Sequence, residues 1–257
     1  MTGMDPWVSA FERMAARHWQ ATEQAHLGGW LLRAAGGFTG RANSALPLGE
    51  PGMPTERAVD EVEAWYRQRG LKPMIVIATG LNADRSALDH LLARRGWPKR
   101  QAPALVMTAS TVVVTGHRRP VAPSRADELF FAAEPDEDWL AAYRYRGQQL
   151  PADALPVLLS APAQVFASVR RDGHTVATGR LSLADGWGGL TAIKVDPACR
   201  RAGLGIAVTA ALAARAAARG AERIFLQVEE DNAAARALYA RCGFVGRHRY
   251  HYRIAPE

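Results

Sequence analysis

The sequence predicts an α/β fold built from two related halves. Between about residues 163 and 253, apolar and turn residues follow the order of three strands, a helix, a strand, a helix and a final strand. A helix that connects neighbouring strands is typical of a sheet covered by helices. A similar order of helix, glycine and strand recurs in the first half, and 48% apolar with 22% charged residues is the composition of a folded protein.

The expected elements divide near residue 120, because residues 117–126 are rich in proline and arginine and carry no periodic pattern. We therefore expect residues 1–120 and residues 121–257 to form two domains. The first part is expected to contain a helix over 7–18, an extended hairpin over 29–48, a helix after the N-cap Thr55, a strand over 74–77, a helix over 88–95 and one or two strands over 106–114. The second part is expected to contain short helices over 136–145 and 152–159, strands over 165–169, 176–183 and 190–195, a helix from 204 closed by Gly220, a strand over 224–228, a helix over 233–241 and a strand over 244–253, with Asp-Gly turns at 172–173 and 185–186.

The two parts also resemble each other. Residues 69–77 align with residues 219–227 at a spacing of 150, and residues 90–97 align with residues 237–244 at a spacing of 147. In both copies a helix, a strand, a second helix and a glycine-aromatic pair follow one another. A recurring pattern of this kind predicts two copies of one fold in tandem.

The composition narrows the class of protein. The 32 basic and 25 acidic residues leave a net charge of +7, which fits nucleic acid, a membrane surface or an anionic small molecule and selects none of them. The basic residues are spread along the chain, so a solvated surface is the favoured explanation and nucleic acid is not the favoured partner. Apolar stretches fall far short of the roughly 18 residues of a membrane span. Two cysteines exclude a disulfide framework, and we expect a cytoplasmic protein with no membrane partner and no metal.

The most informative segment runs from Ile193 to Ile206. A strand ends at Val195, a turn follows, and an Arg-x-x-Gly-x-Gly string that begins at Arg200 leads into a helix. Free N–H groups at the start of a helix, with glycines that allow close approach and arginines that add charge, form a cradle for a diphosphate. The string alone is weak evidence for such a site. Its distance along the sequence to the segment 232–244 strengthens this interpretation.

These segments, Val-Asp-Pro before Arg-x-x-Gly-x-Gly and then Asn-x-Ala-Ala-x-x-Leu-Tyr-x-x-x-Gly-Phe, resemble the GNAT superfamily of acyl-CoA-dependent N-acetyltransferases over about residues 163–253. The resemblance implies the α+β GNAT fold, with mixed central sheets flanked by helices, and acetyl-CoA as co-substrate. In the family, one strand pairs with pantetheine, and the matching residues are Ile193, Lys194 and Val195. A loop holds the pyrophosphate, an asparagine contacts the CoA arm and a tyrosine protonates the departing thiolate; the matching residues are Arg200, Arg201, Ala202, Gly203, Leu204, Gly205, Ile206, Asn232 and Tyr239.

The general base is where the sequence departs from its relatives. The second half is most similar to the ribosomal-protein N-terminal acetyltransferases, which carry a glutamate where this chain has Gln227, and an amide cannot accept the proton. Side chains two residues apart on a strand point the same way, so Glu229 is the candidate base, acting through water. An exposed acid at the end of a strand is an equally good interpretation of Glu229.

The last strand alternates basic residues with histidine and tyrosine. In the family this strand borders the acceptor pocket, which makes Tyr250 and Tyr252 candidates for its lining. An edge strand kept soluble by its charges is the favoured interpretation.

The first half lacks the residues that the resemblance assigns to the cofactor. At the spacing of 150, Glu50 falls on Arg200, and a glutamate would repel a diphosphate. The arrangement resembles mycothiol synthase and other actinobacterial two-domain acetyltransferases, with a degenerate first copy that shapes the acceptor site. Arg41 and Asn43 are either pocket residues or part of a solvated strand face.

We therefore expect an acetyl-CoA-dependent N-acetyltransferase that moves an acetyl group to a primary amine of a small molecule or peptide by direct attack in a ternary complex. Such a transfer needs both reactants oriented, a proton acceptor for the amine and a proton donor for the thiolate. Tyr239 is the expected donor and Glu229 the candidate acceptor. The alternatives are a mycothiol-synthase-like enzyme, and a module without turnover that senses CoA or associates with nucleic acid.

Overall fold

The computed structural model describes residues 5–81, 83, 86–100, 102–116, 127–143 and 148–257 of the chain. Its helices are α1 (Pro6–Ala16), α2 (Thr55–Arg67), α3 (Ala87–Arg94), α4 (Thr111–Gly116), α5 (Glu137–Ala142), α6 (Ala154–Leu158), α7 (Leu204–Ala217) and α8 (Ala233–Arg241), with short 3₁₀ helices η1 (Gly40–Ala42) and η2 (Pro197–Cys199). Its strands are β1 (Glu23–Leu27), β2 (Trp30–Ala34), β3 (Leu46–Pro47), β4 (Met74–Gly80), β5 (Ala104–Ser110), β6 (Asp127–Ala132), β7 (Ala163–Arg171), β8 (His174–Ala184), β9 (Trp187–Val195), β10 (Arg223–Glu229) and β11 (Val245–Ile254). Among the residues described, no helix is long and apolar enough to cross a lipid bilayer.

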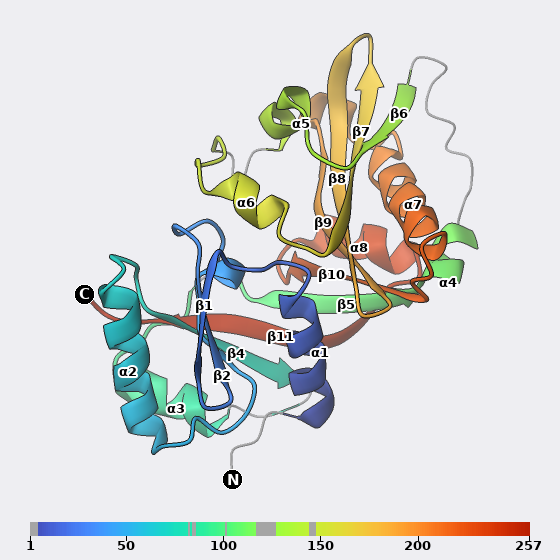
Figure 1. Cartoon of the computed structure of the whole chain (residues 1–257). Helices are drawn as coiled ribbons and strands as arrows, with labels where there is room; N and C mark the ends of the chain where they lie inside the picture. Colours follow the sequence, from blue (N-terminus) through green and yellow to red (C-terminus); the bar gives the residue numbers. More distant parts are fainter. Residues whose placement is uncertain (1–4, 82, 84–85, 101, 117–126, 144–147) are drawn as a thin grey trace.

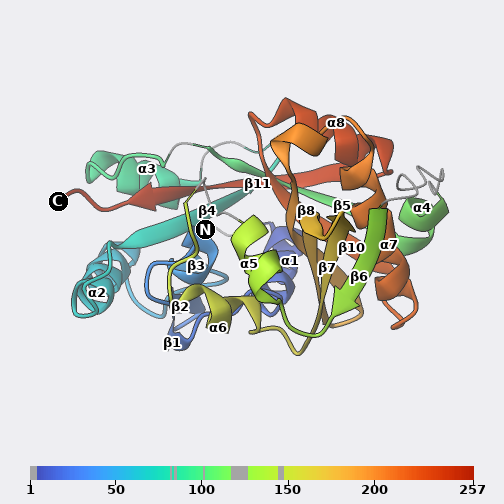
Figure 2. The same cartoon turned by 90° about the horizontal axis from the view of Figure 1, so that it is seen from above.

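One eight-stranded mixed sheet runs through both halves of the chain, in the order β4-β11-β5-β10-β9-β8-β7-β6. β5 comes from the first half and lies between β10 and β11, and β11 in turn lies between β5 and β4. The halves therefore interleave one strand each, with α2 and α3 at one end of the molecule and α7 at the other (Figures 1 and 2). The α/β class with a large mixed sheet and flanking helices is confirmed. The domain boundary near residue 120 stays a proposal, and the expected linker over 117–126 lies outside the described residues.

Four expectations about individual elements are wrong. In the extended hairpin expected over 29–48, residues 40–42 form η1, and only Leu46–Pro47 of the second arm is a strand. The strand expected over 106–114 ends at Ser110, and the chain turns into α4, where the N–H of Thr111 donates to the carbonyl of Glu222. The helix expected after Thr55 begins at Thr55 itself, with Pro54 in the N-cap position. The last strand is not an edge strand, because β11 is hydrogen-bonded on both sides.

The turns and the recurring pattern agree with the structure. The β7–β8 and β8–β9 hairpins turn at the two expected Asp-Gly pairs, and all four residues have positive φ angles between 50° and 79°. Positive φ at both central residues matches the twist of a tight hairpin. β4 with α3 and β10 with α8 repeat the same order, and each helix ends at a glycine with positive φ, Gly96 and Gly243.

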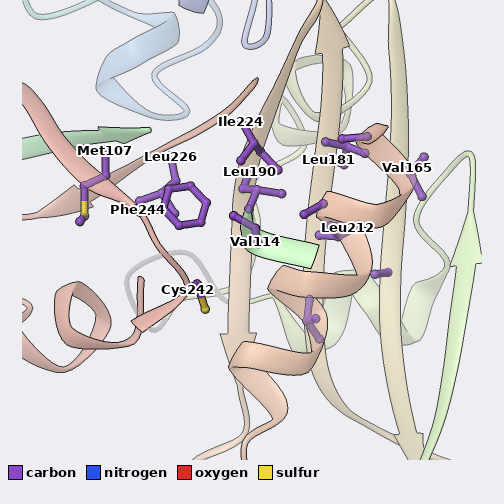
Figure 3. Packing of buried hydrophobic residues seen from close by; sticks show 14 of the residues in the cluster. Met107, Val114, Val165, Leu181, Leu190, Leu212, Ile224, Leu226, Cys242 and Phe244 are labelled. Atoms are coloured by element: carbon purple, nitrogen blue, oxygen red, sulfur yellow. The ribbon is translucent and has the colours of Figure 1, made fainter. Parts of the chain in front are cut away.

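The main hydrophobic core lies between the sheet and α7, and it also crosses residue 120. Figure 3 shows Leu212 of α7 near Leu181 and Leu190 of the sheet, with Met107 and Val114 from the first half in the same cluster. Gly179 of β8 lets the helix approach, since a Cβ there would lie 2.6 Å from Cγ1 of Val208. Core packing thus fixes the position of α7 at the end of β9, where the candidate site begins.

Candidate active site

The parallel strands β9 and β10 pair only over their first four residues, from Trp187–Arg223 to Leu190–Leu226. Beyond that point β9 continues along β8, and β10 continues along β5. A bulge in β9 accompanies the divergence, with Ala192 at a φ of 54° and its carbonyl bound by Oγ1 of Thr178 at 3.0 Å. The two strands therefore open toward their carboxyl ends, and within the described chain no strand pairs with this edge of β9 beyond Leu190.

The loop between β9 and α7 lies directly at this opening. The side chain of Asp196 accepts a hydrogen bond from the N–H of Ala198 at 2.8 Å and starts η2. Arg200 and Arg201 are exposed, and Arg201 and Gly203 have φ angles of 67° and 81°. The first N–H groups of α7 have no acceptor within their own helix, and the helix dipole favours a negative charge beside them. This end of α7 therefore fits a diphosphate group.

Close packing of α7 on α8 brings the loop next to Tyr239. A Cβ on Gly205 would lie 2.8 Å from Cδ1 of Leu238, the residue before Tyr239, so the glycine lets the two helices approach. The ring of Tyr239 packs edge-on against Phe244, with 5.8 Å between the ring centroids. Burial raises the pKa of Tyr239 to about 12. The hydroxyl is therefore protonated at neutral pH, and among the described residues it has no hydrogen-bond partner.

Asn232 has a structural role in the fold. Its Oδ1 accepts a hydrogen bond from the N–H of Ala235 at 3.0 Å and caps α8. Side-chain caps of this kind stabilise a helix by about 1 kcal/mol. The contact with the CoA arm stays a prediction.

Gln227 and Glu229 both line a hollow of about 720 Å³ at the end of β10, as their spacing predicts. Nη1 of Arg41 donates to Oε1 of Gln227 at 2.8 Å, and the hydroxyl of Tyr250 donates to the same oxygen at 3.3 Å. Glu229 is exposed at the end of the strand. Glu229 is therefore either the general base or an acid on the surface, and both interpretations stay open.

Of the two first-half candidates, only Arg41 reaches the hollow. Asn43 is 3% exposed and holds the loop before η1, since its Oδ1 accepts from the N–H groups of Ala35 and Gly37 at 2.7 and 2.9 Å. Asn43 is therefore a structural residue, and Arg41 is a pocket residue.

A second, narrow hollow, which we call the central cavity, lies between the two halves and beside the opening of β9 and β10. Its polar lining comes from α1 and the segment that follows it, and from β2, η1 and the sheet: Glu12, His18, Arg33, Arg41, Ser182, Thr191, Gln227, Tyr250 and Tyr252. Tyr250 and Tyr252, which the sequence offered as candidates for a pocket lining while an edge strand was the favoured interpretation, both line this cavity. Glu12, His18 and Arg33 were missed, although a lone arginine in the apolar run 30–35 is a signal of a buried functional charge.

The electrostatics of the central cavity are set by burial. Burial, followed by the charge of Arg180, lowers the pKa of His18 to about 4, so its ring is neutral at pH 7. Burial, followed by the charge of Arg41, lowers the pKa of Arg180 to about 9. Glu12 accepts a hydrogen bond from Nε2 of His248 at 2.6 Å. The cavity therefore carries more positive than negative charge.

The order of the sheet, the opening between two parallel strands and the loop that leads into α7 define the class of fold, the GNAT fold. Residues 8–253 match the family described as "Probable histone acetyltransferase Rv0428c C-terminal", and the chain belongs to that family. It is 32% identical over 260 residues to the uncharacterized N-acetyltransferase YobR of Bacillus subtilis, covering 96% of this chain and 98% of that protein. It is 31% identical over 256 residues to the probable histone acetyltransferase Rv0428c of Mycobacterium tuberculosis, covering 97% of this chain and 74% of that protein.

Solved structures agree with this assignment at the level of the fold. A GCN5-related N-acetyltransferase from Kribbella flavida superimposes with a TM-score of 0.69 at 19% identity, covering 100% of this chain and 97% of that chain. A tandem GNAT protein from the clavulanic acid biosynthesis pathway superimposes with a TM-score of 0.59 at 14% identity, covering 83% and 76% of the two chains. The expected GNAT fold and its likeness to tandem GNAT proteins are confirmed.

Proposed function

We propose that this GNAT acetyltransferase uses acetyl-CoA and transfers the acetyl group to a primary amine of a small molecule or peptide. The observation that carries the proposal is the opening of β9 and β10 directly before the loop over 200–206. When bound, acetyl-CoA supplies an acetyl group activated as a thioester. The backbone of Ile193, Lys194 and Val195 would bind the pantetheine arm, and the N–H groups of residues 203–206, with Arg200 and Arg201, would bind the diphosphate.

The proton transfers are assigned to two side chains. Tyr239 keeps the proton on its Oη at neutral pH, since its pKa is about 12, and it donates that proton to the thiolate. Glu229 accepts a proton from the amine through water. Gln227 takes no proton, and its Oε1 already accepts hydrogen bonds from Arg41 and Tyr250.

The acceptor would occupy the central cavity, which both halves line. The first half then acts as the wall of the acceptor site, without a cofactor of its own. This role agrees with the position of β5, which enters the large sheet beside β10, while β1, β2 and β3 form a separate three-stranded sheet.

Release of free thiol from acetyl-CoA, measured with a panel of primary amines, tests the proposal. We expect amine-dependent release that Tyr239→Phe slows by at least about 100-fold, the usual size of a general-acid contribution. The variant should keep its melting temperature, and Arg57→Gln on the exposed face of α2 serves as a control with normal activity. No release with any amine, together with DNA binding that weakens as salt rises, would instead support the module without turnover.

A further inference from the structure

The charges around the central cavity are unbalanced. The titratable and charged side chains that line it are Glu12, His18, Arg33, Arg41, Tyr250 and Tyr252. Arg180 lies directly behind this lining, where its Nη1 donates to the carbonyl of His18 and to Oγ1 of Thr191. At neutral pH the neutral ring of His18 adds no charge, so three guanidinium groups face one carboxylate, and that carboxylate is already bound to His248.

Arg33 is a buried cation bound only to neutral groups. The Nε atom of Arg33 donates to the carbonyl of Ser44 at 3.0 Å, and its Nη2 atom donates to Oγ of Ser44 at 2.9 Å. Within the described part of the chain no carboxylate forms an ion pair with Arg33, although the residue is only 5% exposed. Arg253 is 6% exposed, and its Nε donates to the carboxylate of Asp89 at 2.7 Å. The fold therefore supplies a direct ion pair to one buried arginine, whereas Arg33 in the cavity lining has only Glu12 as a nearby negative charge.

Arg41 and Arg180 are also two positive charges without a paired carboxylate among the described residues, and both lie against the ring of Trp19. Their guanidinium carbons lie 4.5 and 5.1 Å from the ring centroid of Trp19. Nη2 of Arg180 is buried without a hydrogen-bond partner among the described residues, and neither arginine forms an ion pair with a described carboxylate. Two like charges over one ring repel each other, and a bound anion would remove that repulsion.

We propose that the acceptor amine carries a carboxylate, which Arg33 and Arg41 bind in the central cavity with help from the hydroxyl group of Tyr252. This inference rests on the proposed acetyltransferase function. A guanidinium presents paired N–H donors that match the two oxygens of a carboxylate. The substrate class is thus an amino acid or a similar amino acid-like molecule, and the second ammonium group of a polyamine would be repelled.

Matched pairs of amines test the inference. The standard L-amino acids and their α-carboxamides would be compared as acceptors by thiol release from acetyl-CoA. For the best pair we expect kcat/KM to be at least about tenfold higher for the acid, since a charged hydrogen bond is lost in the amide. Arg41→Gln should lower this acid-to-amide ratio at least about tenfold, and Arg57→Gln on α2 should leave it unchanged. Equal rates for acid and amide, or a ratio unchanged in Arg41→Gln, would overturn the inference while leaving the acetyltransferase function intact.

A second measurement separates the two proposals. Melting temperatures would be recorded with the same acids and amides in the absence of acetyl-CoA. If no amine supports thiol release, the proposed function fails; acids that raise the melting temperature more than amides, with the difference lost in Arg41→Gln, still support an anion site. If acids and amides raise the melting temperature equally, the carboxylate site is refuted.

Discussion

Nη1 of Arg41 donates a hydrogen bond to Oε1 of Gln227 at 2.8 Å, which joins the first half of the chain to strand β10 of the second. Gln227 holds the position where the most similar N-terminal acetyltransferases are expected to carry a glutamate. An amide oxygen accepts from Arg41 without cancelling its positive charge, whereas a carboxylate would cancel it. The glutamine therefore keeps the guanidinium available to an anionic acceptor.

Gln227→Glu tests this relationship. The new carboxylate would pair with Arg41 and compete with an acceptor carboxylate, so we expect KM for the best amino acid acceptor to rise about tenfold or more. The melting temperature should be maintained, because the hydrogen bonds from Arg41 and Tyr250 are kept. Steady-state kinetics measure KM of the variant for the best amino acid acceptor and for its α-carboxamide. A variant whose KM rises equally for both compounds would contradict the electrostatic explanation.

Tyr239→Phe should change the rate and leave the fold unchanged. Burial raises the pKa of the hydroxyl to about 12, so it stays protonated between pH 7 and pH 10. We therefore expect that kcat of the wild-type protein does not fall over this range through deprotonation of the donor. The phenylalanine ring keeps the packing on Phe244, and the unfolding free energy should change by less than about 1 kcal/mol. A wild-type rate that falls with an apparent pKa near 10 would argue against this assignment of the donor.

Local pattern was enough to predict most elements of the fold. The two Asp-Gly turns, the strand ending at Val195 and the helices on either side of β10 each depend on a few neighbouring residues. The interleaving of β5 and β11 was not predictable in this way, because it pairs Thr108 with Val245 across more than half of the chain. Without that pairing, the alternating charges of β11 resemble those of an edge strand.

The candidate site was also predictable only where its residues are close together in the sequence. The diphosphate loop and Tyr239 lie in continuous segments, so their spacing alone allowed both to be predicted. The central cavity is built from eight different helices and strands or the segments beside them, and no single stretch of sequence contains it. Arg33 and Arg180 did give a local signal, each being the one charged residue within an apolar strand, β2 or the middle of β8.

Because the strands interleave, the second half should not fold alone. Residues 121–257 without β5 would expose the edges of β10 and β11 and lose Leu105 and Met107 from the main core. Edges and apolar surface of this kind lead to aggregation. We expect residues 121–257 to be insoluble when expressed alone and soluble when co-expressed with residues 1–120. A soluble fragment with cooperative unfolding would contradict the dependence on β5.

Gly203→Ala and Gly220→Ala form a matched pair for the loop. The two glycines have φ angles of 81° and 79°, and an alanine in this left-handed region costs about 1–2 kcal/mol. Both variants should therefore lose similar unfolding free energy in urea denaturation. Only Gly203→Ala, at the start of α7, should also raise KM for acetyl-CoA, whereas Gly220 lies beyond the other end of the helix. Equal KM values in the two variants would remove the loop from the proposed cofactor site.

His18 should make the protein less stable in acid. Burial first, and then Arg180, lower the pKa of its ring in the folded protein to about 4, whereas the unfolded chain takes up the proton near pH 6.5. The unfolded state therefore binds more protons between these values, and the contribution to the unfolding free energy falls by about 3 kcal/mol as pH drops from 6.5 to 4. His18→Asn, which removes the titrating ring and its 2.9 Å contact with Ser182, should lower stability at pH 7 and remove this part of the pH dependence. Chemical denaturation from pH 7 to pH 4 measures the difference, with His26→Asn on an exposed position of β1 as the control. Parallel curves for the wild-type protein and His18→Asn would show that His18 is not held neutral beside the central cavity.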